Sequence, residues 1–268
     1  MQRSFRHKKK FGQNFLTDPA LLDKIARLCP PGPAALEIGA GAGALTRALA
    51  NRFPLVAALE IDRDLAPLLE ANLAGCDHVH LAFADARKLD FDAYMADLGA
   101  SQYAIVANLP YYITTPLLMQ AVEENQGAED MIFMVQKEVA DRLAAQPGSK
   151  SYGAVTVAVQ YRCQVDLALQ VGRKAFTPPP EVDSTVVRLK RRPPEIPTDP
   201  TAFRQTVRAA FSQRRKTLRN SLKATSLAAD HLDRALAACA IDPTRRAETL
   251  SVNEFAQLSK ALYPPEKG

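Results

Sequence analysis

The sequence predicts an α/β fold with a mostly parallel sheet, whose last two strands run antiparallel, followed by a small C-terminal all-α domain. First, apolar runs of strand length alternate with helical patterns, which is typical of parallel α/β sheets. Second, a glycine-rich turn joins the first apolar run directly to a helix. Third, a proline-rich linker precedes a region of helical periodicity, so we expect two domains, at residues 1–192 and 198–268.

The first half of the predicted sheet follows a basic N-terminal tail. A helix is expected to begin at Thr17 or Asp18, either of which can cap it, with Pro19 in its first turn. Four strands then alternate with helices between glycine and proline breaks. The expected strands cover residues 34–38, 55–61, 79–84 and 103–107, and the expected helices cover residues 44–51, 64–73 and 117–124.

The second half of the sheet is expected to contain three further strands. The first of them covers residues 131–136 and is followed by helices at 137–145 and 154–161. Strands at 165–171 and 185–190 then close the sheet. Because the connection between these two strands is too short for a helical crossover, we expect them to pair antiparallel.

The C-terminal domain is predicted to be helical. Asp199 and Pro200 begin a helix with an apolar buried face. Shorter helices follow near 230–239 and 252–262, and Ser251 begins the latter in a capping-box spacing. The polar side of the first helix is expected to carry the basic residues Arg214, Arg215, Lys216, Arg219 and Lys223.

Composition argues against several classes of protein. No apolar run approaches the roughly 18 residues that a membrane span needs. The N-terminus is basic and lacks the apolar core of a signal peptide, so we expect a cytoplasmic protein. The cysteines stand singly, which indicates neither a zinc site nor a disulfide framework, and no metal is expected. They are Cys29, Cys76, Cys163 and Cys239.

The net charge of +5 is unevenly distributed along the chain. Residues 1–17 hold five Arg and Lys and no acid, and residues 200–229 hold seven and no acid. The rest of the chain therefore carries 22 basic and 29 acidic residues, a charge of −7. A single basic helix is often only solvated surface, but two basic segments on an acidic body are expected of a nucleic-acid-binding protein.

A strand, a glycine loop and a helix follow one another around residues 37–43, a pattern typical of nucleotide sites. Glu60 lies 21 residues after Gly39, where either an NAD enzyme or a methyltransferase has its ribose-binding acid. Asp85 ends the next strand and is placed to accept a hydrogen bond from an adenine amino group. It could equally cap the turn that follows.

The fourth strand runs into Asn108, which opens a turn that continues to Tyr112. In open α/β sheets, ligands bind beyond the carboxyl ends of the strands. The Asn108 side-chain oxygen and the carbonyls of the turn can accept hydrogen bonds from an amino group, and Tyr111 offers a ring for stacking. An ordinary surface turn closed by Pro110 is the alternative. Phe176, before three prolines, belongs either to a rigid surface loop or to an aromatic face over a base.

Eight motifs, in this order, span nearly the whole chain. They are FGQNFL at 11–16, EIGAGAG at 37–43, LEID at 59–62, DA at 85–86, NLPYYITTP at 108–116, QKEVADRL at 136–143, FTPPPEVDS at 176–184 and FSQRRKTLRN at 211–220. Together they resemble the bacterial small-subunit ribosomal RNA adenine N6,N6-dimethyltransferases. The sequence departs from that family at Tyr112, where Asn is frequent, and at Ala40, where Pro is frequent.

The resemblance implies a Rossmann-like class I methyltransferase domain at 1–192 that uses S-adenosylmethionine, and an RNA-binding helical domain at 198–268. It implies that the target adenine is held by Asn108, Leu109, Pro110 and Tyr111, with Phe176 as the second stacking face. The donor-binding residues that it implies are Asn14, Leu16, Gly39, Gly41, Glu60, Asp85 and Asn108. RNA contacts are expected from the basic residues Lys8, Lys9, Lys10, Arg214, Arg215, Lys216, Arg219, Arg245 and Arg246.

The same resemblance implies a substrate and a role. The expected reaction is N6,N6-dimethylation of two adjacent adenosines in the 3′-terminal hairpin loop of 16S ribosomal RNA. The partner would be small-subunit RNA or a 30S assembly intermediate, and the chain would act as a monomer in ribosome biogenesis. Three alternatives stay open: a dimethyltransferase of large-subunit RNA, a non-catalytic assembly factor on the same scaffold, and an NAD dehydrogenase.

Overall fold

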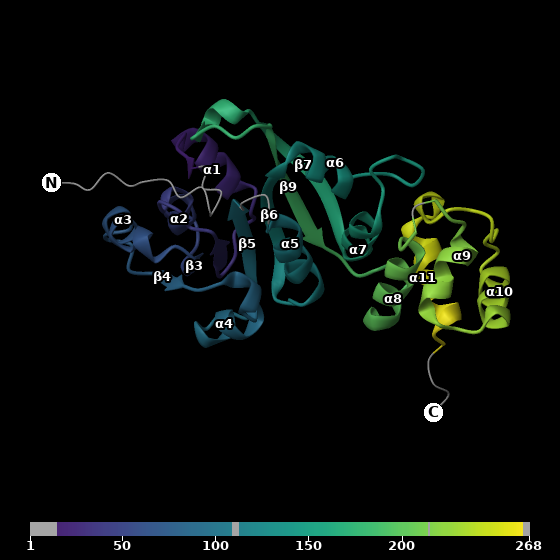
Figure 1. Cartoon of the computed structure of the whole chain (residues 1–268). Coiled ribbons are helices and arrows are strands. Elements are labelled where there is room, and N and C mark those ends of the chain that lie inside the picture. Colours follow the sequence, from purple (N-terminus) through teal and green to yellow (C-terminus); the bar gives the residue numbers. More distant parts are fainter. Residues whose placement is uncertain (1–14, 109–112, 214, 265–268) are drawn as a thin grey trace. The chain divides into compact units, whose positions relative to one another are not determined.

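The computed structural model describes residues 15–108, 113–213 and 215–264 (Figure 1). The chain divides into two compact units, each of which consists of two separate stretches of the sequence. The first unit contains residues 1–140 and 165–191, and the second contains residues 141–164 and 192–268.

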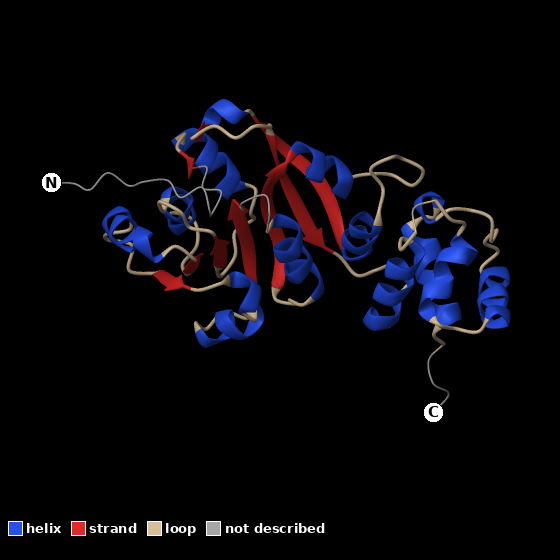
Figure 2. Cartoon of the chain, in the orientation of Figure 1, coloured by secondary structure: helices blue, strands red, loops and turns tan. Residues whose placement is uncertain are grey.

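One mixed sheet of seven strands forms the centre of the first unit. The strands are β2 (Ala35–Ile38), β3 (Val56–Glu60), β4 (Val79–Phe83), β5 (Tyr103–Asn108), β6 (Ala128–Gln136), β7 (Cys163–Val171) and β9 (Ser184–Arg191). Their order is β4-β3-β2-β5-β6-β9-β7. Figure 2 draws the strands as red arrows. The pairs from β4 through β6 are parallel, whereas β9 pairs antiparallel with β6. The predicted fold class, with a mostly parallel sheet and antiparallel end strands, is confirmed.

The helices between the strands are α1 (Pro19–Arg27), α2 (Ala44–Ala50), α3 (Ala66–Asn72), α4 (Phe91–Asp97), α5 (Thr114–Glu123) and α6 (Lys137–Leu143). Of the two predicted caps, Thr17 and Asp18, it is Asp18 that caps α1: its carboxylate accepts hydrogen bonds from the backbone N–H groups of Ala20 and Leu21, at 2.9 and 3.3 Å. α4 is absent from the sequence-based expectations. It is capped by Asp90 and buries Phe91 and Met95 completely, so two side chains fix this seven-residue helix to the core.

α1 and α2 pack against the sheet in one apolar cluster. Ile25 of α1 and Leu49 of α2 are buried beside Val106 of β5 and Val186 of β9. This burial fixes α1 immediately after a short strand, β1 (Phe15–Leu16), which pairs antiparallel with β8 (Phe176–Thr177). β1 is thereby held beside the carboxyl ends of β2 and β5, where Phe15 and Leu16 line the same pocket as Gly39 and Asn108.

The second unit is helical and contains α7 (Ala154–Arg162), α8 (Pro200–Ala210), α9 (Leu218–Leu222), α10 (Ala229–Ala238) and α11 (Val252–Leu262). Its core is built around Phe203, Leu236 and Phe255, each at most 1% exposed. The capping box predicted at α11 forms, because the Ser251 hydroxyl accepts from Glu254 N–H and the Glu254 carboxylate accepts from Ser251 N–H. No helix of the described residues is long and apolar enough to span a membrane.

Residues 141–164 lie with the C-terminal helices, whereas the sequence predicts them in the sheet domain. Tyr161 of α7 stacks on Phe203 of α8 with ring centroids 3.8 Å apart. The Tyr161 hydroxyl lies 3.1 Å from the Ile196 carbonyl oxygen and accepts a 2.9 Å hydrogen bond from Thr198 N–H. These long-range contacts, which no local pattern reveals, join α7 to the segment after the linker.

The helix predicted to begin at Asp199 and to carry the basic residues is shorter than expected. α8 ends at Ala210, where the Ser212 hydroxyl donates to the Ala209 carbonyl, and a turn leads to the separate α9. Leu218 N–H then donates to the Arg245 carbonyl at 2.6 Å instead of continuing a helical ladder. Arg215 and Lys216 therefore lie on an exposed turn and not on the polar side of one long helix.

Candidate functional site

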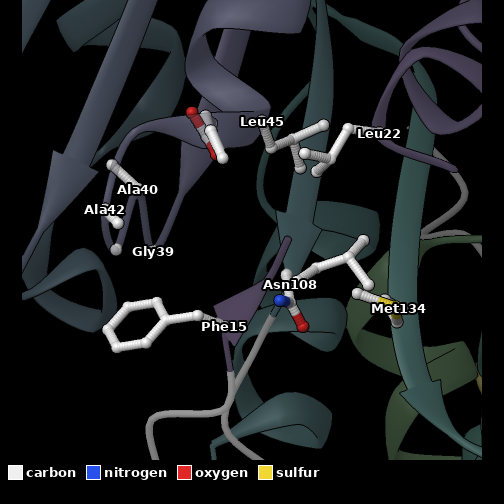
Figure 3. A pocket seen from close by; sticks show the side chains of 12 residues that line it. Phe15, Leu22, Gly39, Ala40, Ala42, Leu45, Asn108 and Met134 are labelled. Carbon is white, nitrogen blue, oxygen red and sulfur yellow. The ribbon is translucent and has the colours of Figure 1, made fainter. Parts of the chain in front are cut away.

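A pocket opens where β2 and β5 end at the carboxyl edge of the sheet (Figure 3). Gly39 and its loop form one wall, and Phe15, Asn108 and Met134 lie around the opening. Parallel β2 and β5 are direct neighbours, and this adjacency brings the glycine loop and Asn108 together as the strand pattern predicts. The complete lining is Phe15, Leu16, Leu22, Glu37, Gly39, Ala40, Gly41, Ala42, Ala44, Leu45, Asn108 and Met134.

The glycine loop has a backbone that side chains would disturb. Gly39, Gly41 and Gly43 have φ values of +83°, +57° and +83°, in the left-handed region that favours glycine. A Cβ at Gly41 would lie 2.9 Å from the ring of Phe15. Asn72 of α3 donates to the Ala42 carbonyl at 2.8 Å and fixes the loop from outside. The loop thus presents its backbone to the pocket in a fixed conformation.

Glu60, at the end of β3, holds the same loop through hydrogen bonds. Its Oε2 accepts from Gly41 N–H at 2.8 Å, and its Oε1 accepts from Ile61 N–H and Asp62 N–H, both at 2.8 Å. Burial raises the pKa of this carboxyl, and the three N–H donors oppose that increase. Because Oε2 accepts from one donor among the described residues, it retains capacity to accept from a ligand hydroxyl.

Glu37 is a residue of the pocket for which the sequence predicts no role. It is 1% exposed, it lines the pocket, and its Oε2 has no hydrogen-bond partner among the described residues. Burial, followed by the charge of Glu60, raises the pKa of Glu37 to about 8, while the Thr46 hydroxyl opposes the increase. A buried carboxyl with an unpaired oxygen beside a glycine loop fits a cationic or hydrogen-bond-donating ligand.

We expect the stability of the protein to depend on Glu37 above pH 5. The folded protein keeps a proton that the unfolded chain releases near pH 4.5. The free energy of unfolding therefore falls as the pH rises from 4.5 to about 8, and it levels off above that pH. Each unit of pKa difference corresponds to about 1.4 kcal/mol. Thermal unfolding of the wild type and Glu37→Gln between pH 5 and pH 9 measures the effect, because glutamine cannot ionise. Parallel curves for the two proteins would contradict a raised Glu37 pKa.

The sequence leaves two roles open for Asp85, a cap and an adenine contact, and the structure shows the first. It caps the turn after β4 by accepting from Arg87 N–H, and its carboxylate also pairs with the Arg87 guanidinium at 2.9 and 2.7 Å. The Arg87 hydrogen bonds lower the pKa of Asp85. The capping role is therefore confirmed, and the adenine contact stays a prediction. Ile61, next to Glu60, is 44% exposed and offers an apolar surface at this rim, a residue that the sequence analysis did not select.

The predicted target-base site is described only in part. Asn108 is half-buried at the pocket, whereas Leu109, Pro110, Tyr111 and Tyr112 lie outside the described residues, as does the donor-site residue Asn14. Phe176 is only 5% exposed, and its strand β8 pairs with β1, where Leu16 is its direct partner. Its ring packs in the apolar cluster of α1 and α2. In this structure, therefore, Phe176 supports the β1 segment.

The predicted RNA-binding residues differ in how they are engaged. Arg215 and Lys216 are exposed, whereas Arg219 forms a two-point ion pair with Asp233. Arg245 donates to Glu254 and to Thr249, so its guanidinium braces the start of α11. Arg246 lies 3.9 Å from the Glu248 carboxylate. Lys8, Lys9, Lys10 and Arg214 lie outside the described residues.

Similarity to known proteins extends over almost the whole chain. The family model for "Ribosomal RNA adenine dimethylase" matches residues 4–263. Two proteins named "Ribosomal RNA small subunit methyltransferase A" are similar over at least 95% of this chain and 92% of their own length. The one from Geobacillus kaustophilus is 46% identical, and the one from Moorella thermoacetica is 47% identical.

Two solved structures have the same fold at lower identity. A dimethyladenosine transferase from Plasmodium falciparum superposes with a TM-score of 0.77 and 25% identity, covering 91% of this chain and 95% of that one. The 23S rRNA methyltransferase ErmE superposes with a TM-score of 0.69, also at 25% identity, over 93% and 99% of the two chains. The relatives named for the small subunit are thus far more similar in sequence than the solved structure named for 23S RNA.

Proposed function

The chain belongs to the ribosomal RNA adenine dimethylase family, and on that premise we propose that it dimethylates two adjacent adenosines in the 3′-terminal hairpin loop of 16S RNA. It is a small-subunit ribosomal RNA adenine dimethyltransferase. The proposal rests on the position of Asn108, which lines the same pocket as the glycine loop. An amide that accepts from an amino group therefore lies beside a nucleotide-type site.

The site fits S-adenosylmethionine, the methyl donor of this family. Glu37 presents a buried oxygen without a partner, which suits the positively charged methionine end. Glu60 Oε2 retains capacity for a ribose hydroxyl, and exposed Ile61 offers an apolar face to the adenine. Leu16, Gly39 and Gly41 would hold the remaining backbone contacts. Asn14 and Asp85 complete the donor site that we propose.

A dehydrogenase is the poorer fit to the same loop. A dinucleotide would place its pyrophosphate at the glycine loop, but this pocket contains the carboxyl of Glu37 and lies beside Glu60. Burial raises the pKa of Glu37 to about 8, and a bound phosphate would oppose its ionisation further. A cationic group would instead stabilise the ionised carboxylate, so the site suits a cationic cofactor better than a pyrophosphate.

The amine of adenine is a weak nucleophile because its lone pair is delocalised into the ring. We assign to the Asn108 side-chain oxygen the role of accepting one N6–H, which localises the lone pair on the nitrogen. Leu109 and Pro110 would accept through their carbonyl groups, and Tyr111 would stack on the base. When bound, S-adenosylmethionine supplies an electrophilic methyl group on a sulfonium. The methylated nitrogen is acidic enough to lose its proton to water, so no strong base is required.

We also propose different roles for the two domains. Residues 1–192 would carry catalysis and residues 198–268 would bind RNA, with residues 141–164 packed among the helices of the latter. Phosphate contacts would come from the exposed Arg215 and Lys216, and from Arg219, Arg245 and Arg246 once they exchange their present partners. Lys8, Lys9, Lys10 and Arg214 would add further positive charge. We propose a cytoplasmic monomer that acts on a 30S assembly intermediate.

Mapping dimethyladenosine tests the proposed function. We expect small-subunit RNA from cells that carry the gene to contain two adjacent dimethyladenosines in its 3′-terminal hairpin, and RNA from cells without it to lack both. Adding the purified chain and S-adenosylmethionine to subunits from the second strain should restore them. Modification of large-subunit RNA instead would assign the chain to the other branch, and no modification would favour an assembly factor.

A further inference from the structure

A second pocket lies within the helical unit. It is formed by the polar side of α8, the short 3₁₀ turn Lys223–Thr225 and the residue that follows α11. Its volume of about 360 Å³ is within the roughly 300–1,000 Å³ typical of small-ligand sites. The lining residues are Gln205, Arg208, Ala209, Ser212, Ala224, Thr225 and Tyr263.

The polar groups of this pocket supply both donors and acceptors. The Ser212 hydroxyl donates to the Ala209 carbonyl at 2.7 Å, and the Thr225 hydroxyl donates to the Leu222 carbonyl at 2.7 Å. Because the hydroxyl protons are engaged, both oxygens can only accept from a ligand, and Thr225 Oγ1 already accepts a 3.4 Å hydrogen bond from Leu227 N–H. Arg208 and Gln205 are exposed, and neither has a hydrogen-bond or ion-pair partner in the described part of the chain. Their N–H groups are available to a ligand.

The charge around the pocket attracts an anion. None of its lining residues is acidic, and residues 200–229, which supply six of the seven, hold seven Arg and Lys and no acid. Arg208 lies in the last turn of α8, where a cation also interacts favourably with the helix dipole. That interaction accounts for a basic side chain at this position. It does not account for an unpaired amide, two acceptor hydroxyls and a tyrosine gathered around one hollow.

We propose that this pocket binds one unstacked nucleotide of the ribosomal RNA substrate. The phosphate pairs with Arg208, Tyr263 supplies an aromatic surface for the base, and Gln205, Ser212 and Thr225 hydrogen-bond to the base edge. This chemistry suits single-stranded RNA, whose splayed bases stack on aromatic rings. The proposal rests on the proposed function, because it assigns part of the same RNA to the helical unit.

Binding to small subunits that lack the dimethyladenosines tests the proposal. We expect Arg208→Gln and Tyr263→Leu each to weaken binding about ten-fold, as loss of a stacking or phosphate contact does. Arg208→Gln should also reduce the slope of log affinity against log salt by about 1. The matched control is Arg234→Gln, which removes one charge from an exposed position on α10. If both variants bind like Arg234→Gln, the pocket does not contact the RNA.

A nucleotide titration separates the ligand sources. Adenosine and uridine 5′-monophosphates should perturb the NMR signals of the pocket in the full-length protein, and Tyr263→Leu should weaken this binding about ten-fold. If inorganic phosphate binds as well as either nucleotide, the pocket is only an anion site and the proposal is overturned. Methyl transfer by the wild type is measured on the same subunits. Its absence would refute the proposed function, whereas unchanged variants with active wild type would refute only the pocket.

Discussion

Replacing Asn108 with alanine is expected to lower the rate of methyl transfer at least about 100-fold, while binding of the small subunit stays close to that of the wild type. Asn108 ends β5 and lines the pocket beside the glycine loop. Removing one preorganised polar group at a reacting centre typically costs about 10²–10³ in rate. The loss arises because the N6 lone pair is no longer localised by an acceptor. Single-turnover transfer at saturating S-adenosylmethionine measures this step.

The matched control for this experiment is Asn51→Ala. Asn51 is an exposed residue at the end of α2 and lies outside the pocket lining. Its replacement should leave the rate of methyl transfer unchanged. The comparison shows whether the loss is specific to the amide at the pocket. Near-normal transfer by purified Asn108→Ala would remove Asn108 from the catalytic centre, and unchanged RNA binding would show that the variant is folded.

The rim of the pocket was predictable because each of its residues lies at the end of a strand or directly after one. Parallel strands end at one edge, so Gly39, Glu60 and Asn108 had to approach one another once the strands were assigned. The cap at Asp18 was predictable for a similar reason, since an N-cap bonds only to N–H groups two or three residues away. These features therefore follow from the position of each residue relative to the end of its own strand or helix.

Other features depend on contacts between distant segments. α8 ends before the basic residues, and Leu218 N–H bonds to the carbonyl of Arg245, which the spacing of apolar residues cannot indicate. Arg245 looked like an RNA ligand, yet its guanidinium is held by Glu254. The burial of Phe176 likewise depends on the pairing of two very short strands, β1 and β8. Sequence patterns identify such residues but not the partners that they find.

Glu60→Ala is expected to have the second large effect, a loss of at least about 100-fold in affinity for S-adenosylmethionine. The carboxylate accepts hydrogen bonds from the N–H groups of Gly41, Ile61 and Asp62, all at 2.8 Å. Glu60 is only 6% exposed, so alanine would leave these donors without their acceptor at a poorly solvated position. Each buried unsatisfied donor costs about 1–3 kcal/mol, and relaxation of the glycine loop then removes the preformed donor site.

Calorimetric titration with S-adenosylmethionine, together with thermal unfolding, tests this prediction against the control Glu70→Ala. Glu70 is an exposed acid on α3, so its replacement removes the same charge without touching the loop. Glu60→Ala should lower both the affinity and the unfolding temperature, because the hydrogen bond from Gly41 N–H joins the loop to β3 and the other two order the turn after β3. If its affinity stays within a few-fold of Glu70→Ala, the ribose is not held at Glu60. The loop would then keep its binding conformation through Asn72 and through the hydrogen bonds that Gly39 N–H and Ala40 N–H donate to the Leu59 carbonyl.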